Sequence, residues 1–519
     1  MKNKKIFNIT GPCIPQKHYM LNAFHRIEEV MSLIEGESYF VIHAARQSGK
    51  TTLLLELTLK LNAQREYYAL YCSLESSQGI ADSEKGIPSI VKTIKDAIKN
   101  STLPEKENFA ISADYSDYSN VLKSTLSDYC RVLDKPLVIF FDEADCLSES
   151  TLISFLRQIR NGYNTRSLSP FVHSLALVGM RNIRDFKVKI RQDSDTLGSA
   201  SPFNIVSKSL TIKNFSKQEI ADLYWQHTDV TGQIFEEQAI EQVYQETDGQ
   251  PWLVNAIARE VSDEILKSDY SKKITANLID VAIQNIILRR DTHIDSLLER
   301  LKEERVRKVI EPIISGTKNE INYTDDDTQY CLNLGLIKDT DKILRPANKI
   351  YAEVIIRTLS YNTQYHLHTQ IQNVWIDKNG MIDMDGLLKG FQQFWRENSS
   401  VWIEKYEYKE AAPHLILQAF LQRIINGGGI ILREYASGRE RMDLCVIYQS
   451  KKYPIELKIL YSDKTETEGL FQLTGYLNTI GETLGWLILF DRKQDKSWEE
   501  KIYWKTEKVN GKTIHVVGC

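Results

Sequence analysis

The sequence predicts a multidomain α/β protein. Its 519 residues exceed what one hydrophobic core accommodates, because single cores stop growing at about 250–300 residues. Residues 39–57 and 430–479 each combine short apolar, β-rich runs with helix-like stretches, whereas residues 215–258 show apolar positions at helical spacing only. We therefore expect α/β domains near both ends of the chain, with a helical region between them.

Composition limits the protein classes that fit. With 42% apolar and 26% charged residues, the chain has an ordinary globular composition. A net charge of -4 excludes a uniformly basic surface, so nucleic-acid contacts would need local patches. The 7 cysteines include no CxxC pair, which favours reduced thiols and no structural zinc. Without an uncharged stretch of bilayer length, we expect a cytoplasmic protein with no membrane partner.

A candidate phosphate-binding loop lies near the N-terminus. Residues 39–43 predict a strand and residues 52–57 a helix, the context that such a loop requires. Backbone N–H groups of the loop would bind phosphate oxygens, Lys50 would contact the β- and γ-phosphates, and the Thr51 hydroxyl would ligate magnesium. Ala44 replaces the usual first glycine. The candidate nucleotide-binding residues of the loop are Ala45, Arg46, Gln47, Ser48, Gly49, Lys50, Thr51 and Thr52.

A second strand supplies the matching carboxylates. Residues 136–141 are a continuous apolar run that ends in Asp142 and Glu143. Asp142 is expected to hold magnesium, and Glu143 to act as the catalytic residue that orients or deprotonates the attacking water. The two motifs together predict an ATP site with Mg²⁺, whereas either alone would be common.

Two further residues are candidates for contacts with the nucleotide. The strand 174–180 delivers Arg181 at its carboxyl end, where parallel sheets place ligand contacts. Gly249-Gln250-Pro251 interrupts the helical region and predicts either a rigid elbow that faces the nucleotide or a plain turn between two helices. Four arginines are candidates for a residue that reaches a neighbouring subunit, or are solvated surface charges: Arg157, Arg160, Arg166 and Arg184.

Together, Lys50-Thr51, Asp142-Glu143, Arg181 and the Gly-x-Pro motif resemble those of STAND-type and archaeal AAA-like P-loop ATPases. The resemblance implies an ATPase core over residues 1–214, a helical lid over 215–285 and a winged helix over 286–376. It further implies γ-phosphate sensing by Arg181, contact of Pro251 with the base or sugar, and a homo-oligomer formed through the ATPase domain. Whether the winged helix contacts DNA or transmits the nucleotide state stays open, because residues 325–327 are acidic.

The C-terminal region predicts a different site. A helix over 415–425 is followed by strands over 430–435, 442–448 and 453–459, and by a helix over 469–479. Alternation along a strand places Glu456 and Lys458 on one face, and Asp443 would join them from the adjacent strand. Two carboxylates and an amine predict magnesium binding by Asp443 and Glu456, with Lys458 orienting water or stabilising charge.

This arrangement resembles the PD-(D/E)xK nuclease superfamily, in a domain that we place at residues 396–519. Met442 stands where the signature has proline. The resemblance adds Glu410 as a metal ligand, and Gln472 with Tyr476 as further site residues. Arg433, Arg439 and Arg441 would either form a positive rim for phosphate or pair with Glu434 and Glu440.

The chain as a whole resembles bacterial AAA-like ATPases that carry a C-terminal PD-(D/E)xK domain. Our hypothesis is an ATP-binding and ATP-hydrolysing switch that controls a magnesium-dependent nuclease acting on nucleic acid, most simply DNA, in defence or mobile-element biology. The alternative is a nucleotide-regulated scaffold whose nuclease-like domain binds nucleic acid or protein without cutting. A further alternative is an ATPase that binds ATP without turnover, supported only by Ala44.

Overall fold

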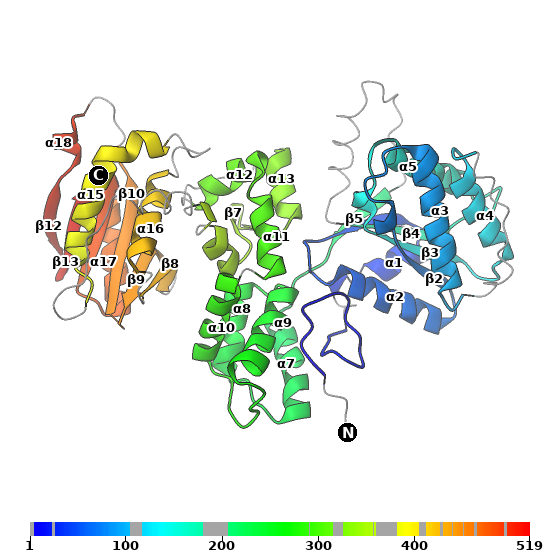
Figure 1. Cartoon of the computed structure of the whole chain (residues 1–519), viewed down its shortest axis with the longest axis horizontal. Coiled ribbons are helices and arrows are strands. Elements are labelled where there is room, and N and C mark those ends of the chain that lie inside the picture. The colour runs from blue at the N-terminus through cyan, green and yellow to red at the C-terminus, as the bar shows by residue number, and fades with distance from the viewer. Residues whose placement is uncertain are drawn as a thin grey trace. The chain divides into compact units, whose positions relative to one another are not determined.

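The computed structural model (Figure 1) forms two compact units. The first comprises Met1–Leu297, Ile321–Lys342 and Ala347–Ile350, and the second Leu298–Glu320, Ile343–Pro346 and Tyr351–Cys519. The structure describes residues 5–22, 26–27, 29–103, 117–179, 206–289, 291–314, 325–355, 358–359, 381–403, 412–425, 429–437, 440–449, 451–460, 464–491 and 496–519.

The first unit contains a five-stranded parallel sheet with the order β2-β3-β4-β1-β5. Strands β1, β3 and β4 are buried along their whole length, which explains their continuous apolar sequences. All carboxyl ends of a parallel sheet lie at one edge, so the loops after β1 and β3 share that edge. The strands are β1 (Tyr39–His43), β2 (Tyr68–Ser73), β3 (Leu137–Asp142), β4 (Ser174–Gly179) and β5 (Val206–Thr211).

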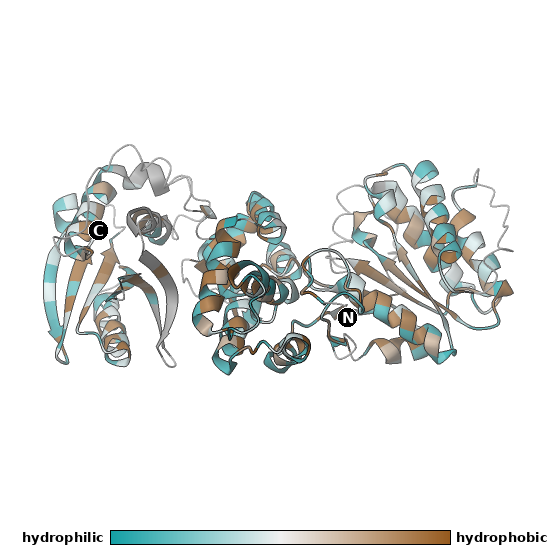
Figure 2. Cartoon of the chain, turned by 60° about the horizontal axis from the view of Figure 1, so that its bottom comes forward, coloured by the Kyte–Doolittle hydropathy of each residue, from teal (hydrophilic) through white to brown (hydrophobic). Residues whose placement is uncertain are grey.

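Helices cover both faces of this sheet, and alternate residues of β1 enter separate cores. Phe40 and Ile42 pack with residues of α1 (Val30–Glu35) and α2 (Lys50–Gln64). Tyr39 and Val41 enter the opposite core. Figure 2 shows the apolar strands between more polar helices. The opposite core is covered by α3 (Ser83–Lys99), α4 (Val121–Val132) and α5 (Glu149–Asn164).

A helical region follows the sheet. The first helix begins with a capping box, in which Ser216 and Glu219 satisfy each other's backbone N–H groups. Pro251 occupies the first turn of α9, where its missing N–H costs nothing. The Gly-Gln-Pro segment is therefore the junction between two helices. The helices are α7 (Lys217–Thr231), α8 (Glu237–Thr247), α9 (Pro251–Arg259), a π-helical turn (Glu260–Ile265), α10 (Ala276–Arg289), α11 (Thr292–Arg300) and α13 (Asp326–Asn333).

The predicted winged-helix region contains two short strands, β6 (Ile337–Thr340) and β7 (Ile343–Pro346), which form a two-stranded sheet. Helix α12 (Glu304–Ile314) precedes them. Residues 360–376, the end of the predicted domain, lie outside the described residues. The winged helix stays a prediction.

The second unit holds a six-stranded mixed sheet with the order β12-β13-β11-β10-β9-β8. Helix α17 (Lys464–Ile480) connects the parallel strands β10 and β11 and packs on one face. The opposite core contains aromatic side chains of α15 (Met384–Ile403) and α16 (Ala412–Ile425). The remaining elements are β8 (Gly429–Ser437), β9 (Glu440–Tyr448), β10 (Lys451–Ile459), β11 (Leu484–Phe490), α18 (Trp498–Lys501), β12 (Trp504–Val509) and β13 (Lys512–Gly518).

Among the described residues, the structure contains no helix that combines the length and the apolar character needed to cross a membrane.

Gly249 tests how tightly the α8–α9 junction is packed. Its φ is +70°, and a Cβ there would lie 1.8 Å from the backbone oxygen of Phe215. Gly232 is a matched control, since its φ is +77° and a Cβ would meet nothing within 4 Å. Gly249→Ala should reduce the free energy of unfolding by at least about 2 kcal/mol more than Gly232→Ala. Urea denaturation of both variants measures this, and equal losses would contradict the junction geometry.

Candidate functional site

The phosphate-binding loop joins β1 to α2. Its backbone needs a left-handed residue at Gly49, whose φ is +86°, and another at Gln47, whose φ is +58°. A Cβ at Gly49 would also lie 3.2 Å from Nη1 of Arg26. Ala44 is buried, and its N–H donates to the Gly179 carbonyl oxygen at 3.2 Å. Alanine in place of the first glycine is therefore accommodated at the end of the strand.

Lys50 lies inside the loop rather than in solvent. Its Nζ donates to the carbonyl oxygens of Ala44 at 3.0 Å and Ala45 at 2.9 Å. Burial lowers the pKa of Lys50, while the carboxylates of Glu143 and Asp142 oppose that shift. The ammonium group is thus held beside the backbone that would surround a phosphate.

The predicted magnesium ligands meet directly. Thr51 Oγ1 donates to Asp142 Oδ2 at 2.8 Å, and the Tyr71 hydroxyl donates to the same oxygen at 3.1 Å. The Glu143 N–H donates to Asp142 Oδ1 at 3.0 Å. Asp142 is buried, so these bonds compensate a carboxylate withdrawn from water. Tyr71 was not predicted from the sequence, where β2 carries no motif.

Glu143 has the features of a catalytic carboxylate. It lies directly after β3 with a φ of +57°, a conformation that costs a non-glycine residue energy and is frequent at functional sites. Burial raises the pKa of Glu143, and the charges of Asp142 and Asp145 raise it further. A carboxylate of raised basicity is suited to accept a proton from water.

The loop contains polar atoms that fit a phosphate ligand. Within the described part of the chain, the buried Gln47 Oε1 and Ser48 Oγ have no hydrogen-bond partner. A buried polar atom without a partner costs about 1–3 kcal/mol. The Ser48 hydroxyl can donate to a phosphate oxygen, whereas Gln47 Oε1 accepts and would need a donor such as water. The free Ser48 hydroxyl therefore fits the group that the motif implies.

Arg26 supports the loop from the other side. Its Nη2 donates to the Ser48 carbonyl oxygen at 2.8 Å and its Nε to the Lys213 carbonyl oxygen at 2.7 Å. Burial lowers the pKa of Arg26 to about 10. Arg26 fixes the loop through its backbone, and no local sequence pattern distinguishes it from a surface arginine.

The helical region contacts the loop through Gln250 rather than Pro251. Gln250 Nε2 donates to the Gln47 carbonyl oxygen at 3.4 Å, while its Oε1 caps α9 by accepting from the Leu253 N–H at 2.7 Å. Arg46 is directed to α11, where its Nη1 donates to Ser296 Oγ at 3.0 Å. The Thr52 hydroxyl accepts from the Cys13 N–H at 3.0 Å. Arg181 lies outside the described residues.

The C-terminal site joins residues of β9 and β10. The regular antiparallel pairing ends at Leu444 and Ile455, and side chains replace it beyond that point. Asp443 Oδ2 accepts from the Leu457 N–H at 2.9 Å, and Lys458 Nζ donates to Glu456 Oε1 at 2.6 Å. The structure thus brings together Asp443, Glu456 and Lys458.

Burial and neighbouring charges shift the pKa values of Glu456 and Lys458 in this cluster. Burial and the neighbouring Asp443 charge raise the pKa of Glu456 to about 8. Burial alone would lower the pKa of Lys458, but Glu456 and Asp443 outweigh it and the net shift is upward. Perturbed ionisable groups in mutual contact mark candidate functional sites, although structural ion pairs share the property.

The other predicted residues of this site have different positions. Gln472 is exposed on α17, and Tyr476 is buried in the core beneath that helix. Glu410 and Arg439 lie outside the described residues. One residue of α16 was missed: His414, whose pKa is lowered by burial and is also affected by the charges of Asp443 and Lys458. In the sequence it looks like any polar residue of a buried helix.

Among the described residues, no group of three or more His, Cys, Asp or Glu side chains forms a metal site. Magnesium commonly uses only one or two protein carboxylates together with substrate phosphates and water. The Asp443 and Glu456 pair fits that donor set.

Comparison with protein-family models gives a match over residues 19–356 to the AAA-like domain. The matched segment is well over half of the chain. The chain belongs to the AAA-like domain family. Its α/β fold with a parallel sheet is typical of a P-loop ATPase core. No curated protein matches the chain.

Solved structures similar to the chain include the Walker-type ATPase paby2304 of Pyrococcus abyssi, at 14% identity over 67% of this chain and 99% of that one, with a TM-score of 0.46. Cdc6p of Pyrobaculum aerophilum has 12% identity over 66% and 96%, with a TM-score of 0.37. The RuvB Holliday junction branch migration motor of Thermotoga maritima has 12% identity over 63% and 91%, with a TM-score of 0.33. Because these TM-scores and identities are low, the assignment of the chain to the AAA-like domain family rests on the match over residues 19–356 alone.

His293 makes the stability of the AAA-like domain depend on pH. It stacks on Trp252 with ring centroids 4.8 Å apart, and burial lowers its pKa to about 3. The unfolded chain therefore binds a proton that the folded chain does not between about pH 3 and 6.5, so stability is lost as pH falls through this window. His293→Phe should show a smaller loss. Chemical denaturation from pH 4 to 7 measures both slopes, and equal slopes would contradict the burial of His293.

Proposed function

We propose that this AAA-like protein is an ATP-binding and ATP-hydrolysing switch that controls a magnesium-dependent nuclease in the same chain. One observation carries the proposal: the Asp443–Glu456–Lys458 cluster occurs in a chain whose Lys50, Thr51 and Asp142 form a P-loop site. The pairing of a nucleotide site with a candidate phosphodiester-cleaving site supports regulation of one by the other. Cytoplasmic defence against foreign DNA, or mobile-element biology, suits such a device.

In the proposed ATPase step, each residue of the N-terminal site has one role. Lys50 neutralises phosphate charge from inside the loop, and Thr51 with Asp142 holds magnesium, which supplies charge stabilisation when bound. Glu143 accepts a proton from the attacking water, which its raised pKa favours. Arg181 remains the proposed γ-phosphate sensor, and Pro251 the proposed contact to the base or sugar.

The nuclease step uses the second cluster. Asp443 and Glu456 would hold the metal ion, which activates water and stabilises phosphate charge when bound. Lys458 is held 2.6 Å from Glu456, where it can orient water or stabilise the developing charge. Gln472 and Glu410 stay proposed contributors, and nucleic acid, DNA in the first instance, is the proposed substrate.

The contacts of the phosphate loop with the helical region support a route by which a bound nucleotide would control the nuclease. Gln250 reaches the loop from α9 and Ser296 from α11, and the chain continues from α11 into the second unit. A phosphate that engages the loop would change these contacts and shift the population of lid positions. Assembly into a homo-oligomer through the ATPase domain would offer a second route.

A scaffold without nuclease activity is the alternative function. It is favoured by the exposure of Gln472 on α17 and by the lack, among the described residues, of a third carboxylate at Asp443 and Glu456. Under this alternative the domain binds nucleic acid or protein, and Lys458→Ala leaves its function intact.

Two substitutions separate nucleotide binding from hydrolysis. Lys50→Ala should weaken ATP binding at least about tenfold, because it removes a charge-assisted contact. Glu143→Gln should retain binding but reduce turnover at least about 100-fold, as expected for the loss of a general base. Fluorescent-ATP titration and a phosphate-release assay measure the two effects. Normal ATP turnover by Glu143→Gln would show that Glu143 is not the general base.

Cleavage assays test the nuclease with a matched pair of lysines. Lys458→Ala should reduce magnesium-dependent cutting of plasmid or single-stranded DNA at least about 100-fold. Lys505 is the control, because it also contacts a glutamate, Glu466, in the same domain, and Lys505→Ala should retain cleavage. Asp443→Ala should abolish cleavage, and ATP or Lys50→Ala should change its rate. Cleavage of equal rate in Lys458→Ala would exclude this active site, and no cleavage with normal ATP turnover would support the scaffold.

A further inference from the structure

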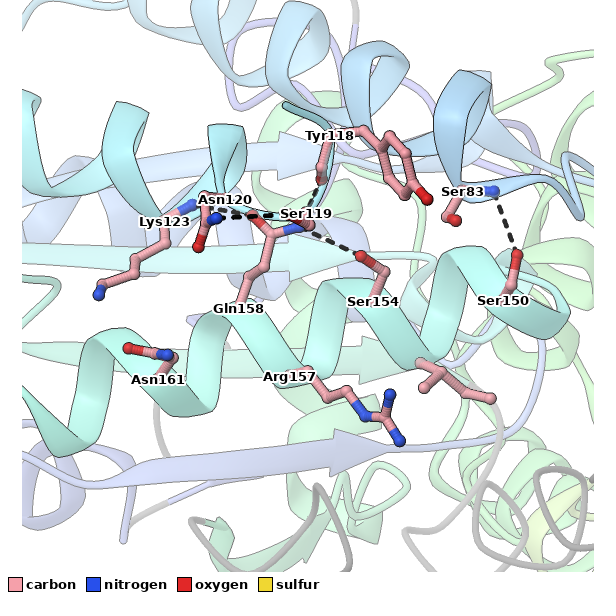
Figure 3. A pocket seen from close by; sticks show the side chains of 11 residues that line it. Ser83, Tyr118, Ser119, Asn120, Lys123, Ser150, Ser154, Arg157, Gln158 and Asn161 are labelled. Carbon is pink, nitrogen blue, oxygen red and sulfur yellow. Dashed lines mark hydrogen bonds between the residues drawn. The ribbon is translucent and has the colours of Figure 1, made fainter. Parts of the chain in front are cut away.

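A cavity lined by polar residues lies on the ATPase core, between α4, α5 and the first residue of α3 (Figure 3). Its volume is about 460 Å³, within the 300–1,000 Å³ range of small-ligand sites. The phosphate loop contributes none of its lining residues.

The residues that line the cavity carry hydrogen-bonding groups and two cations, while carbon atoms of the same side chains form much of its surface. Serine hydroxyls, side-chain amides and the Tyr118 phenol make up most of it, Ile153 is its apolar residue, and it contains no carboxylate. Lys123 and Arg157 supply two positive charges. The nearby Asp117 carboxylate accepts hydrogen bonds from Ser119 and Asn120, so it offsets only part of that charge. A lining of this kind favours an anionic ligand that also carries hydroxyl groups.

Part of the cavity wall is built rigidly. Gln158 is buried, and its Oε1 accepts from the N–H groups of Leu122 at 3.0 Å and Lys123 at 3.2 Å. Its Nε2 donates to the Tyr118 carbonyl oxygen at 2.9 Å and to Ser154 Oγ at 3.2 Å. One side chain therefore fixes the start of α4 against α5. The backbone at this wall is therefore already ordered before a ligand binds.

The cations of the cavity are available for a ligand. In the part of the chain that the structure describes, the side chains of Lys123, Arg157 and Asn161 form no hydrogen bond or ion pair. By contrast, Arg131 further along α4 is bonded to Asp128, and Arg166 after α5 to Glu37. Lys123 and Arg157 therefore offer two positive charges at one cavity, which suits a small anion.

We propose that this cavity binds a small phosphorylated, hydroxyl-bearing compound of sugar-phosphate or nucleotide size, with Arg157 and Lys123 contacting the phosphate and the serine and amide groups contacting the hydroxyls. Such a site would let the ATPase core bind a second ligand that is distinct from its nucleotide. The proposal does not depend on the nuclease activity proposed above.

Calorimetric titration of the full chain with ribose 5-phosphate, in a phosphate-free buffer, tests the proposal. The wild-type chain should bind saturably, and Arg157→Ala should weaken binding at least about tenfold, because a charge-assisted bond is lost. Arg131→Ala is the matched control and should leave the affinity unchanged, as should Lys50→Ala, which alters the phosphate loop instead. Because the Arg157 side chain is exposed and forms no hydrogen bond or ion pair within the described residues, its variant should melt at the wild-type temperature.

Each other result would overturn the proposal. Absence of binding at millimolar ribose 5-phosphate would do so, as would equal affinity in Arg157→Ala. Loss of binding in Lys50→Ala would place the ligand in the phosphate loop. Inorganic phosphate that binds as tightly as ribose 5-phosphate would remove the role of the hydroxyl groups. A single-stranded oligonucleotide that binds in an Arg157-dependent manner while ribose 5-phosphate does not would identify a nucleic-acid surface.

Discussion

The buried carboxylate of Asp142 is the constraint on which the N-terminal site depends. It accepts hydrogen bonds from Thr51 of α2, Tyr71 of β2 and the Glu143 backbone. A carboxylate removed from water is costly unless such bonds compensate it. Its bonds therefore hold the start of α2 against the ends of β2 and β3. Replacing it would leave the Thr51 and Tyr71 hydroxyls without this acceptor and would remove a polar bond between α2 and β3, although the apolar face of α2 would still be packed in the core.

The same physical arrangement recurs in the second unit. Asp443 takes the position of a backbone acceptor for the Leu457 N–H, just where the pairing of β9 and β10 ends. Carboxylates carried by strands thus organise both sites: Asp142 at the end of β3 in a parallel sheet, and Asp443 and Glu456 within β9 and β10 of a mixed sheet. In each, a lysine lies next to the carboxylates, and burial shifts pKa values in ways that water-exposed groups would not show.

Much of this could be predicted from sequence because the signals are local. A continuous apolar run followed by Asp142-Glu143, or alternation that places Glu456 beside Lys458, depends on a few consecutive residues. The element order from α16 to α17 also follows from local patterns. What was missed depends on distant contacts: Arg26 reaches the carbonyl oxygens of Ser48 and Lys213, Tyr71 reaches Asp142, and His414 lies on a helix without a motif. No short pattern encodes such pairs.

The phosphate loop is also packed against residues that lie far from it in the sequence, which its motif does not indicate. Gly335 has a φ of +70°, and a Cβ there would lie 2.4 Å from Cβ of Ala45. Gln250 precedes α9, Ser296 lies in α11 and Gly335 follows α13, and each is in contact with the short segment 45–47 or lies directly against it. Because packed contacts deform little, a change in the backbone of residues 45–47 would also disturb these neighbours. The loop is therefore in direct contact with residues that follow the parallel sheet in the sequence.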